Sequence, residues 1–240
     1  MILQSNYIPW LGYFALIASA DVLVVLDSAK YTKNDWRNRN KLRGANGSFW
    51  LTIPIEHEST RKRIYDATVS DTRWAHKHFF SIREALSGLR FSAQIAERLA
   101  ADYLSFSDER LLHKINLKLI RTICHLGAIS TPVVLDTEVA TAELLSPGTD
   151  PTLRLVNICK KLKATTYLTG SKAMQYLDLD QFRNSSIVVE VADYSQLPVY
   201  RQKYKGFEPS VSVLDYLAAV GSDQASEYLN SGALHSIVIA

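Results

Sequence analysis

The sequence predicts an α/β fold with a mainly parallel sheet, and three observations support this. Short runs of β-branched and leucine residues, such as residues 22–26, lack polar alternation, which is typical of strands buried on both faces. Helical patterns separate these runs along the chain, as in strand–helix–strand units. A hydrophobic fraction of 47% over 240 residues is sufficient for a substantial core. We therefore expect residues 1–240 to form one α/β domain.

The first elements are expected to form a βαβ unit. A short strand at residues 1–4 precedes a turn, and residues 11–20 have a helical pattern with Pro9 near the first turn. A buried strand follows at residues 22–26 and ends at Asp27. This order places the turn around residues 4–7 at the carboxyl end of the first strand.

The middle of the chain combines a polar segment with a helical insertion. Residues 28–48 are polar and irregular, which is too long for a simple connection and indicates a functional loop. A strand is expected at residues 49–55, toward a sheet edge because of Pro54, and residues 56–72 read as polar loop. A helical insertion is expected at about residues 73–128. Its helices are predicted at residues 73–88, 93–104 and 109–126, the last ending before Gly127.

The last third returns to alternating strands and helices. Asp150 and Pro151 are a good N-cap and first residue for a helix that runs to about residue 162. Strands are predicted at residues 132–136, 166–169 and 187–191, and helices at residues 211–219 and 223–230. A turn at Gly170 and Ser171 follows the second of these strands.

Composition excludes several classes of protein. A net charge of +3 is too small to indicate nucleic-acid binding by itself. No apolar run approaches the roughly 18–20 residues that cross a bilayer. The first 21 residues contain no lysine or arginine, and Asn6, Pro9 and Gly12 interrupt their apolar run, unlike a secretory signal. We therefore expect a cytoplasmic protein without membrane insertion.

Neither the cysteines nor the histidines indicate a metal site. Cys124 and Cys159 lie in apolar helical patterns, so free core thiols in a reducing compartment are expected. The six histidines lack the spacing of metal ligands. We expect no bound metal among the protein's own side chains.

The first βα turn is the leading candidate for a ligand site. Ligands bind at the carboxyl ends of parallel strands, where helix N-termini favour anions. Gly12 would allow close backbone approach, and Trp10 and Tyr13 can stack on a flat ring. Alternatively, the aromatic residues are core and the polar residues cap the helix. The candidate residues are Gln4, Asn6, Tyr7, Pro9, Trp10, Gly12 and Tyr13.

Two further clusters carry suitable chemistry. Residues 30–43 interleave arginine, lysine, asparagine and aromatic side chains, which suits phosphate or carboxylate recognition, although a solvated loop or a weak nucleic-acid patch would also explain them. The turn of Gly170, Ser171 and Lys172 would face the same sheet edge as the first turn, or be a plain turn with an exposed lysine. The candidates of the earlier cluster, with Asp27 as a possible acid or base, are Trp36, Arg37, Asn38, Arg39 and Asn40.

Short motifs occur along almost the whole chain, and those in the N-terminal part are the most specific. They are Gln4-x-Asn6-Tyr7-x-Pro9-x-x-Gly12-Tyr13-Phe14, Ala20-Asp21-Val22, Trp36-x-Asn38-Arg39-Asn40, Leu162-x-Ala164-Thr165-Thr166-Tyr167-x-x-Gly170, Tyr176-Leu177, and Tyr200-x-Gln202 with Phe207-x-Pro209 and Ser212-x-x-Asp215. Together these motifs resemble the WbqC-like protein family. This resemblance implies a role in bacterial surface-polysaccharide (O-antigen, lipopolysaccharide) biosynthesis, with glycine or acyl transfer to amino sugars.

A more distant similarity is to nucleotidylyltransferase-like (HUP-like) proteins, which are Rossmann-like. Trp10-x-Gly12-Tyr13 occupies the place of their H-x-G-H helix start, so both histidines that donate to phosphates are replaced here. The resemblance implies ATP with Mg²⁺ at that turn and at the loop of Gly170, Ser171 and Lys172. It also implies that Gln4, Asn6 and Tyr7 line the reacting centre.

Three functions remain open on the sequence. The protein could activate a carboxylate with ATP and attach it to the amino group of a nucleotide sugar. It could transfer an acyl group from an already activated donor, such as a thioester or a charged tRNA. It could also be a non-catalytic protein that binds a nucleotide or nucleotide sugar. The sequence leaves the oligomeric state undetermined.

Overall fold

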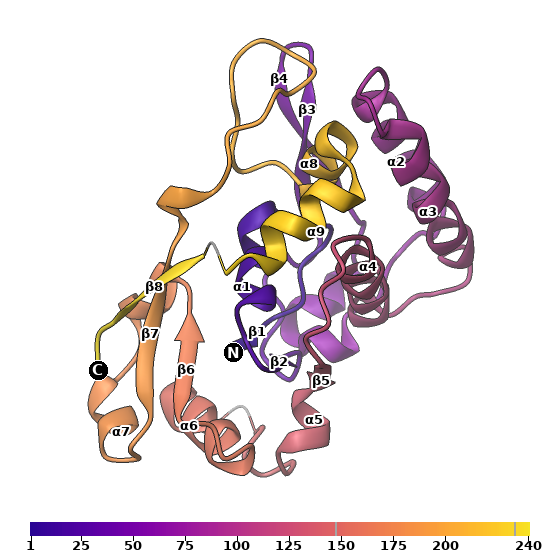
Figure 1. The fold of residues 1–240 in the computed structure, drawn as a ribbon. Coiled ribbons are helices and arrows are strands. Elements are labelled where there is room, and N and C mark those ends of the chain that lie inside the picture. Colours follow the sequence, from indigo (N-terminus) through magenta and orange to yellow (C-terminus); the bar gives the residue numbers. More distant parts are fainter. Residues whose placement is uncertain (147, 233) are drawn as a thin grey trace.

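A central parallel sheet joins the N-terminal and middle parts of the chain (Figure 1). The structure, a computed structural model, describes residues 1–146, 148–232 and 234–240. The strand order is β1-β2-β5, with Ile2 opposite Val24 and Leu23 opposite Val133. Helix α1 connects β1 to β2, so the predicted βαβ unit is confirmed. The bounds are β1 (Ile2–Leu3), α1 (Leu11–Ala18), β2 (Leu23–Val25) and β5 (Val133–Leu135).

A second sheet continues beside β1. Strand β6 is parallel to β7, and β8 pairs antiparallel with the other side of β7. Strand β6 lies next to β1, and Gly170 at its carboxyl end lines the same cleft as Gln4 after β1. The bounds are β6 (Thr166–Thr169), β7 (Val188–Asp193) and β8 (His235–Val238). The arrangement is a Rossmann-like α/β fold, as predicted, with β8 as an additional edge strand.

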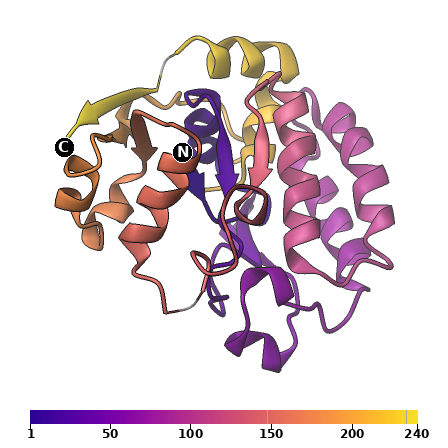
Figure 2. The same ribbon diagram turned by 90° about the horizontal axis from the view of Figure 1, so that it is seen from below.

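The predicted helical segment between residues 73 and 128 is present. Figure 2 shows it on one side of the first strands, with the segment of α6 and β6 on the other side. Helices α8 and α9 lie between β7 and β8 in the chain, near the predicted positions. The bounds are α2 (Trp74–Leu86), α3 (Ser92–Ser105), α4 (Leu112–Leu126), α8 (Val213–Val220) and α9 (Ser222–Asn230). The single-domain organisation stays a prediction.

Short helices complete the connections. Helix α6 starts as predicted, because the Asp150 side chain accepts a hydrogen bond from the Leu153 amide at 2.8 Å and Pro151 is the first helical residue. The α-helices are α5 (Asp136–Val139), α6 (Pro151–Lys161) and α7 (Leu179–Arg183), and the 3-10 segments are η1 (His57–Arg61), η2 (Ile64–Asp66), η3 (Ser171–Gln175) and η4 (Tyr194–Gln196).

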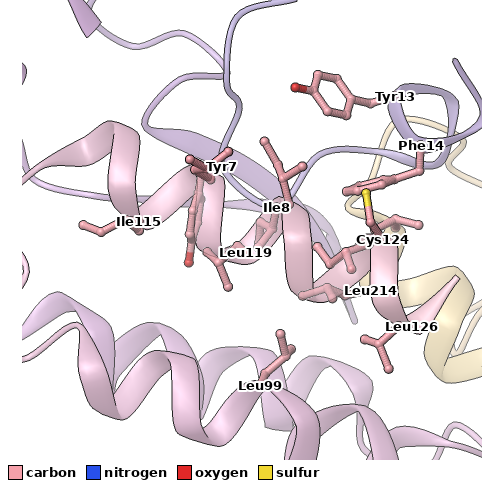
Figure 3. Close-up of a cluster of buried hydrophobic side chains, with 14 of the residues drawn as sticks. Tyr7, Ile8, Tyr13, Phe14, Leu99, Ile115, Leu119, Cys124, Leu126 and Leu214 are labelled. Atoms are coloured by element: carbon pink, nitrogen blue, oxygen red, sulfur yellow. The ribbon is translucent and has the colours of Figure 1, made fainter. Parts of the chain in front are cut away.

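The central sheet separates two hydrophobic cores. Leu23 and Val25 pack into the larger core, part of which appears in Figure 3, while Val24 packs into the smaller one. Strand β2 is therefore buried on both faces, which explains its unbroken apolar run. Cys124 lies in the larger core and Cys159 in the smaller, both as free thiols. Burial raises the pKa of these thiols to about 12 and about 11, respectively.

The prediction of an irregular loop across residues 28–48 is wrong for its second half. Strand β3 (Arg39–Gly44) forms a hairpin with β4 (Gly47–Thr52). Along β3, Asn40 and Leu42 are buried while Arg39 and Lys41 lie outside. An asparagine at an inward position hides the hydrophobic alternation by which a strand is recognised.

Within the described ranges, no helix is both long and apolar enough to cross a membrane.

Candidate functional site

A cleft of about 1780 Å³ opens at the carboxyl ends of the parallel strands. The first turn after β1, the segment of Ser28 to Lys30 after β2, and Gly170 to Ala173 after β6 all contribute to its lining. This is the position at which open parallel sheets bind ligands. The two turns that the sequence places at one sheet edge therefore meet in one cavity.

Most of the residues predicted from the sequence line this cleft. Those that do are Gln4, Asn6, Pro9, Trp10, Tyr13, Trp36, Arg37, Asn40, Gly170, Ser171 and Lys172. Those placed outside its lining are Tyr7, Gly12, Asp27, Asn38 and Arg39. The roles proposed for individual residues stay predictions.

Arg37 is the centre of the polar network beside the first turn. Its Nη1 donates to Oδ1 of Asn6 at 2.6 Å, and its Nη2 lies 3.2 Å from Oδ2 of Asp35. Burial alone would raise the pKa of Asp35, but the charge of Arg37, with hydrogen bonds and the charge of Lys172, leaves that pKa below its usual range. The Arg37 Nε is buried without a hydrogen-bond partner in the described chain. We call Asn6, Arg37 and Lys172 the first-turn subsite.

Trp10 and Tyr13 occupy the start of α1. Trp10 is the N-cap residue, and its ring lies 5.0 Å from that of Tyr194, tilted by 57°. The Tyr13 hydroxyl donates to the Gln4 carbonyl at 3.2 Å. These residues thus form an aromatic wall next to the first-turn subsite, and the Tyr13 hydroxyl is engaged with the backbone.

Gly12 lies behind this wall. A Cβ at this position would lie 2.5 Å from Cζ2 of Trp10, well inside van der Waals contact. From the sequence, we expected Gly12 to let a ligand approach the backbone closely. The structure instead shows that the missing side chain makes room for the Trp10 indole.

Gly12→Ala is expected to displace the indole and lower the free energy of unfolding by about 1–3 kcal/mol, as in overpacked cores. In the interior of a helix, the same change would otherwise stabilise by about 1 kcal/mol. Urea denaturation with near-ultraviolet circular dichroism measures both effects. The double variant Trp10→Ala/Gly12→Ala is the control, because removing the indole removes the clash. A gain of stability in the Gly12→Ala single variant would contradict the close packing.

Tyr7 lies in the core rather than in the cleft. Its hydroxyl is 2.9 Å from Nδ1 of His78 and 2.6 Å from the Tyr103 hydroxyl. Figure 3 shows the Tyr7 and Tyr13 hydroxyls pointing in different directions. Burial lowers the pKa of His78 to about 4, so its ring is neutral at pH 7. The Tyr7 amide donates to the Trp36 carbonyl at 2.9 Å, which ties the first turn to the Arg37 segment.

Tyr7→Phe is expected to destabilise the protein by about 1–3 kcal/mol, because His78 and Tyr103 each lose a buried hydrogen-bond partner. Urea denaturation measures the loss. A double-mutant cycle with Tyr103→Phe should show coupling between the two hydroxyls. Unchanged stability together with lost ligand binding would instead support the reacting role that the sequence suggests for Tyr7.

The hairpin fixes the backbone of the first turn. Nδ2 of Asn40 donates to the carbonyls of Tyr7 and Ile8 at 3.0 and 2.9 Å. Ile8 has a φ of +35°, which is rare for a β-branched residue and costs energy. Nδ2 of Asn38 donates to the Ile53 carbonyl at 2.9 Å and holds the base of the hairpin. Asn40 therefore supports the first turn directly, and Asn38 supports the hairpin that carries Asn40.

The chain is similar to known proteins over almost its whole length. A family model described as the WbqC-like protein family matches residues 4–227. The chain belongs to the WbqC-like protein family. A protein of Mycobacterium tuberculosis named "Uncharacterized protein Rv1507c" is 37% identical over 229 residues, which cover 95% of this chain and 96% of that protein. No solved structure matches the chain significantly.

In this WbqC-like chain, the segments that carry the first and third N-terminal motifs contact each other. Asn6 contacts Arg37, and Asn40 holds the carbonyls that follow Asn6. Arg39 lies apart from them, with its guanidinium carbon 4.2 Å from the centroid of the Trp50 ring. The segments that carry these motifs therefore hold each other in place. Asn6 and Arg37, which bind each other, both line the cleft.

Two buried carboxyl groups lie beneath the cleft of the WbqC-like chain. Oδ1 of Asp27, after β2, accepts a hydrogen bond from the Ser5 amide at 2.9 Å. Its Oδ2 is buried without a partner among the residues that the structure describes. Burial raises the pKa of Asp27 to about 6. Asp136, after β5, accepts from the Ser28 amide at 2.9 Å, and burial also raises its pKa. Both side chains position the backbone of cleft-lining turns.

Sequence reasoning missed much of the positive charge in the cleft. Its lining contains seven basic residues and two acidic ones, Asp35 and Asp66. Each acidic residue is paired with an arginine, Asp66 with Arg63 at 3.5 Å. The short run Arg61-Lys62-Arg63 was the available signal. The basic residues are Lys30, Arg37, Arg61, Lys62, Arg63, Arg154 and Lys172.

This donor set fits the phosphates of a nucleotide. Arginine and lysine side chains bind and neutralise phosphate groups. Mg²⁺ is usually held by one or two carboxylates together with substrate phosphates, and both carboxylates of the lining already pair with arginines. In the described parts of the chain, no group of three or more His, Cys, Asp or Glu residues is placed to hold a metal ion.

Proposed function

We propose that the cleft binds a nucleotide sugar and that the protein acts in polysaccharide-related biosynthesis as an acyl or aminoacyl transferase. Membership of the WbqC-like family supports the role in polysaccharide-related biosynthesis. The site at the carboxyl ends of parallel strands, with its excess of basic side chains, supports a phosphate-bearing ligand. This positive cleft is the single observation that carries the proposal.

In the proposed reaction, the amino group of the sugar attacks an activated carboxyl carbon. An amide bond forms, the bond to the leaving group breaks, and the amine loses a proton. With ATP, the carboxylate first displaces pyrophosphate to give an acyl adenylate, and AMP then leaves. With a thioester or a charged tRNA, the thiol or the tRNA hydroxyl leaves.

The chain's own residues would bind and orient these substrates. Arg37 and Lys172 would hold phosphates, and Trp10 with Tyr194 would pack against a flat ring. Positioning two substrates in one cleft supplies much of the rate enhancement of such transfers.

One observation favours a second function, binding without catalysis. The residues in the place of the H-x-G-H histidines are already engaged, because the Tyr13 hydroxyl donates to Gln4 and the Trp10 ring packs on Tyr194. Neither side chain can replace a histidine that donates a hydrogen bond to a phosphate in the transition state. On this alternative, the cleft retains a nucleotide sugar without converting it.

The test uses purified protein with a panel of nucleotide amino sugars, with glycine and other amino acids, and with ATP and Mg²⁺ or acyl thioesters. Mass spectrometry detects the amide product, and isothermal titration calorimetry measures binding. Amide formation establishes the transferase. Binding of a nucleotide sugar without product from any donor supports the second function. Absence of nucleotide binding overturns both.

A further inference from the structure

A short antiparallel pairing closes one end of the cleft. Lys30 pairs with Arg63, the Tyr31 amide donates to the Lys62 carbonyl at 3.0 Å, and the Ile64 amide donates to the Ala29 carbonyl at 2.9 Å. Segments separated by 30 residues are thus held together after the end of β2. We call the four basic side chains carried here, Lys30, Arg61, Lys62 and Arg63, the basic strap.

The charge of the basic strap is poorly compensated. Of its four cations, Arg63 alone forms an ion pair within residues 1–146, 148–232 and 234–240, and its Nε lies 3.5 Å from Asp66. The other acidic residue of the cleft, Asp35, is paired with Arg37. Four clustered like charges repel one another, and a bound anion would relieve this repulsion.

Two donors below the strap distinguish it from an ordinary solvated surface. Ser28 lines the cleft, and its residue is only 4% exposed. Its hydroxyl lies beside the Asp136 carboxyl, but it has no well-aligned hydrogen-bond partner in the part of the chain described. Arg154 of α6 also lines the cleft, with a buried Nε that likewise lacks a partner there. Its Nη2 is anchored to the Ser146 carbonyl at 2.8 Å. A buried, unsatisfied hydroxyl is costly unless a ligand completes it.

The sheet topology separates these groups from the first-turn subsite. Asn6 follows β1 and Lys172 follows β6, whereas Ser28 and Lys30 follow β2. Arg154 belongs to α6, the helix between β5 and β6. Because the order is β1-β2-β5, with β6 on the other side of β1, Ser28 and Lys30 lie over a different strand from Asn6 and Lys172.

We propose that Ser28, Arg154 and the basic strap form a second anion subsite, which takes a phosphate group while the first-turn subsite holds another. The second phosphate belongs either to the same ligand, as the terminal phosphate of a nucleoside triphosphate, or to a separate phosphorylated co-substrate. This inference rests on the proposed function for the ligand of the first-turn subsite.

The decisive variant is Lys30→Gln/Arg63→Gln, whose two side chains are exposed and whose loss should not prevent folding. Lys160→Gln/Lys161→Gln, at the far end of α6, is the matched control with the same loss of charge outside the cleft. Ser28→Ala tests the buried hydroxyl separately. Calorimetry at fixed ionic strength compares each variant with the unchanged protein, because charge effects depend on salt.

The first experiment titrates inorganic phosphate into protein saturated with nucleoside diphosphate. For a separate co-substrate, phosphate binds to this loaded protein about tenfold more weakly in Lys30→Gln/Arg63→Gln and in Ser28→Ala. For a single ligand, phosphate does not bind, but nucleoside triphosphate binds more tightly than diphosphate, and the same variants remove that preference. The control pair changes neither. If neither measurement responds to the strap variants, the second subsite is overturned.

Failure of the proposed function can be told apart from failure of this subsite. If no nucleotide binds, inorganic pyrophosphate is titrated into the free protein. If Lys30→Gln/Arg63→Gln weakens pyrophosphate binding and Arg37→Ala has little effect on it, the second subsite is supported independently of the proposed function. The reverse pattern, or no binding of pyrophosphate, overturns it.

Discussion

Arg37→Ala is expected to weaken nucleotide-sugar binding about 10- to 100-fold. A hydrogen bond to a charged group contributes about 1.5–3 kcal/mol, and about 1.4 kcal/mol corresponds to a factor of ten in affinity. The change also leaves Asp35 without its cation, so that a carboxylate would then face the phosphates. Isothermal titration calorimetry with the nucleotide sugar identified by the panel measures the loss.

Arg39→Ala is the matched control. The sequence predicts phosphate contacts for both arginines, whereas the structure places Arg39 against the Trp50 ring, outside the cleft. Its replacement should change the dissociation constant less than twofold. Equal effects of the two substitutions would contradict the position assigned to the ligand. Arg37→Lys should recover part of the affinity, since it keeps the charge but not the two-pronged geometry.

Asp27→Asn is expected to remove a pH dependence of stability worth about 3 kcal/mol. The pKa of Asp27 is about 6 in the folded protein and about 3.9 in an unfolded chain, and each unit corresponds to about 1.4 kcal/mol. A raised pKa means that the folded state binds more protons between these values. Stability therefore falls as the pH rises from about 4 to about 6, and stays reduced above it.

The asparagine variant escapes this penalty because it never ionises, and its Oδ1 can still accept from the Ser5 amide. In urea denaturation from pH 4 to pH 8, the free energy of unfolding of the variant should rise relative to that of the unchanged protein as the pH increases. Asp71→Asn is the control. Arg73 lowers the pKa of that exposed carboxyl to about 2, so its own effect lies below this pH range. Parallel curves for the unchanged protein and Asp27→Asn would contradict the assignment.

The position of the cleft was predictable from the sequence because it depends on a general rule. The βαβ pattern places the turn at Asn6 at the carboxyl end of a strand, and the same rule applies to the turn at Gly170 after β6. In a parallel arrangement these ends share one edge. The periodicity of strands and helices in the sequence was therefore sufficient to predict that both turns line one cavity.

Other features depend on contacts that leave no periodic pattern. Asn40 satisfies backbone carbonyls inside the fold, so its strand resembles a loop in the sequence. The basic strap reaches the cleft through a few backbone hydrogen bonds between polar segments. Strand β8 has exposed side chains throughout, and hence no alternation. Tyr7 was assigned to the cleft because a turn position does not reveal which way a side chain points.

The strained backbone of Ile8 affects the order in which the cleft forms during synthesis. The Asn40 amide that holds this turn is 32 residues further along. The N-terminal βαβ unit alone therefore lacks the contact that offsets a strain of about 1–3 kcal/mol. At about 5–20 residues per second, a nascent chain remains without a formed first turn until the ribosome has released the hairpin. A truncated product that ends before Asn40 would carry the family's first motif without the shape that the motif requires.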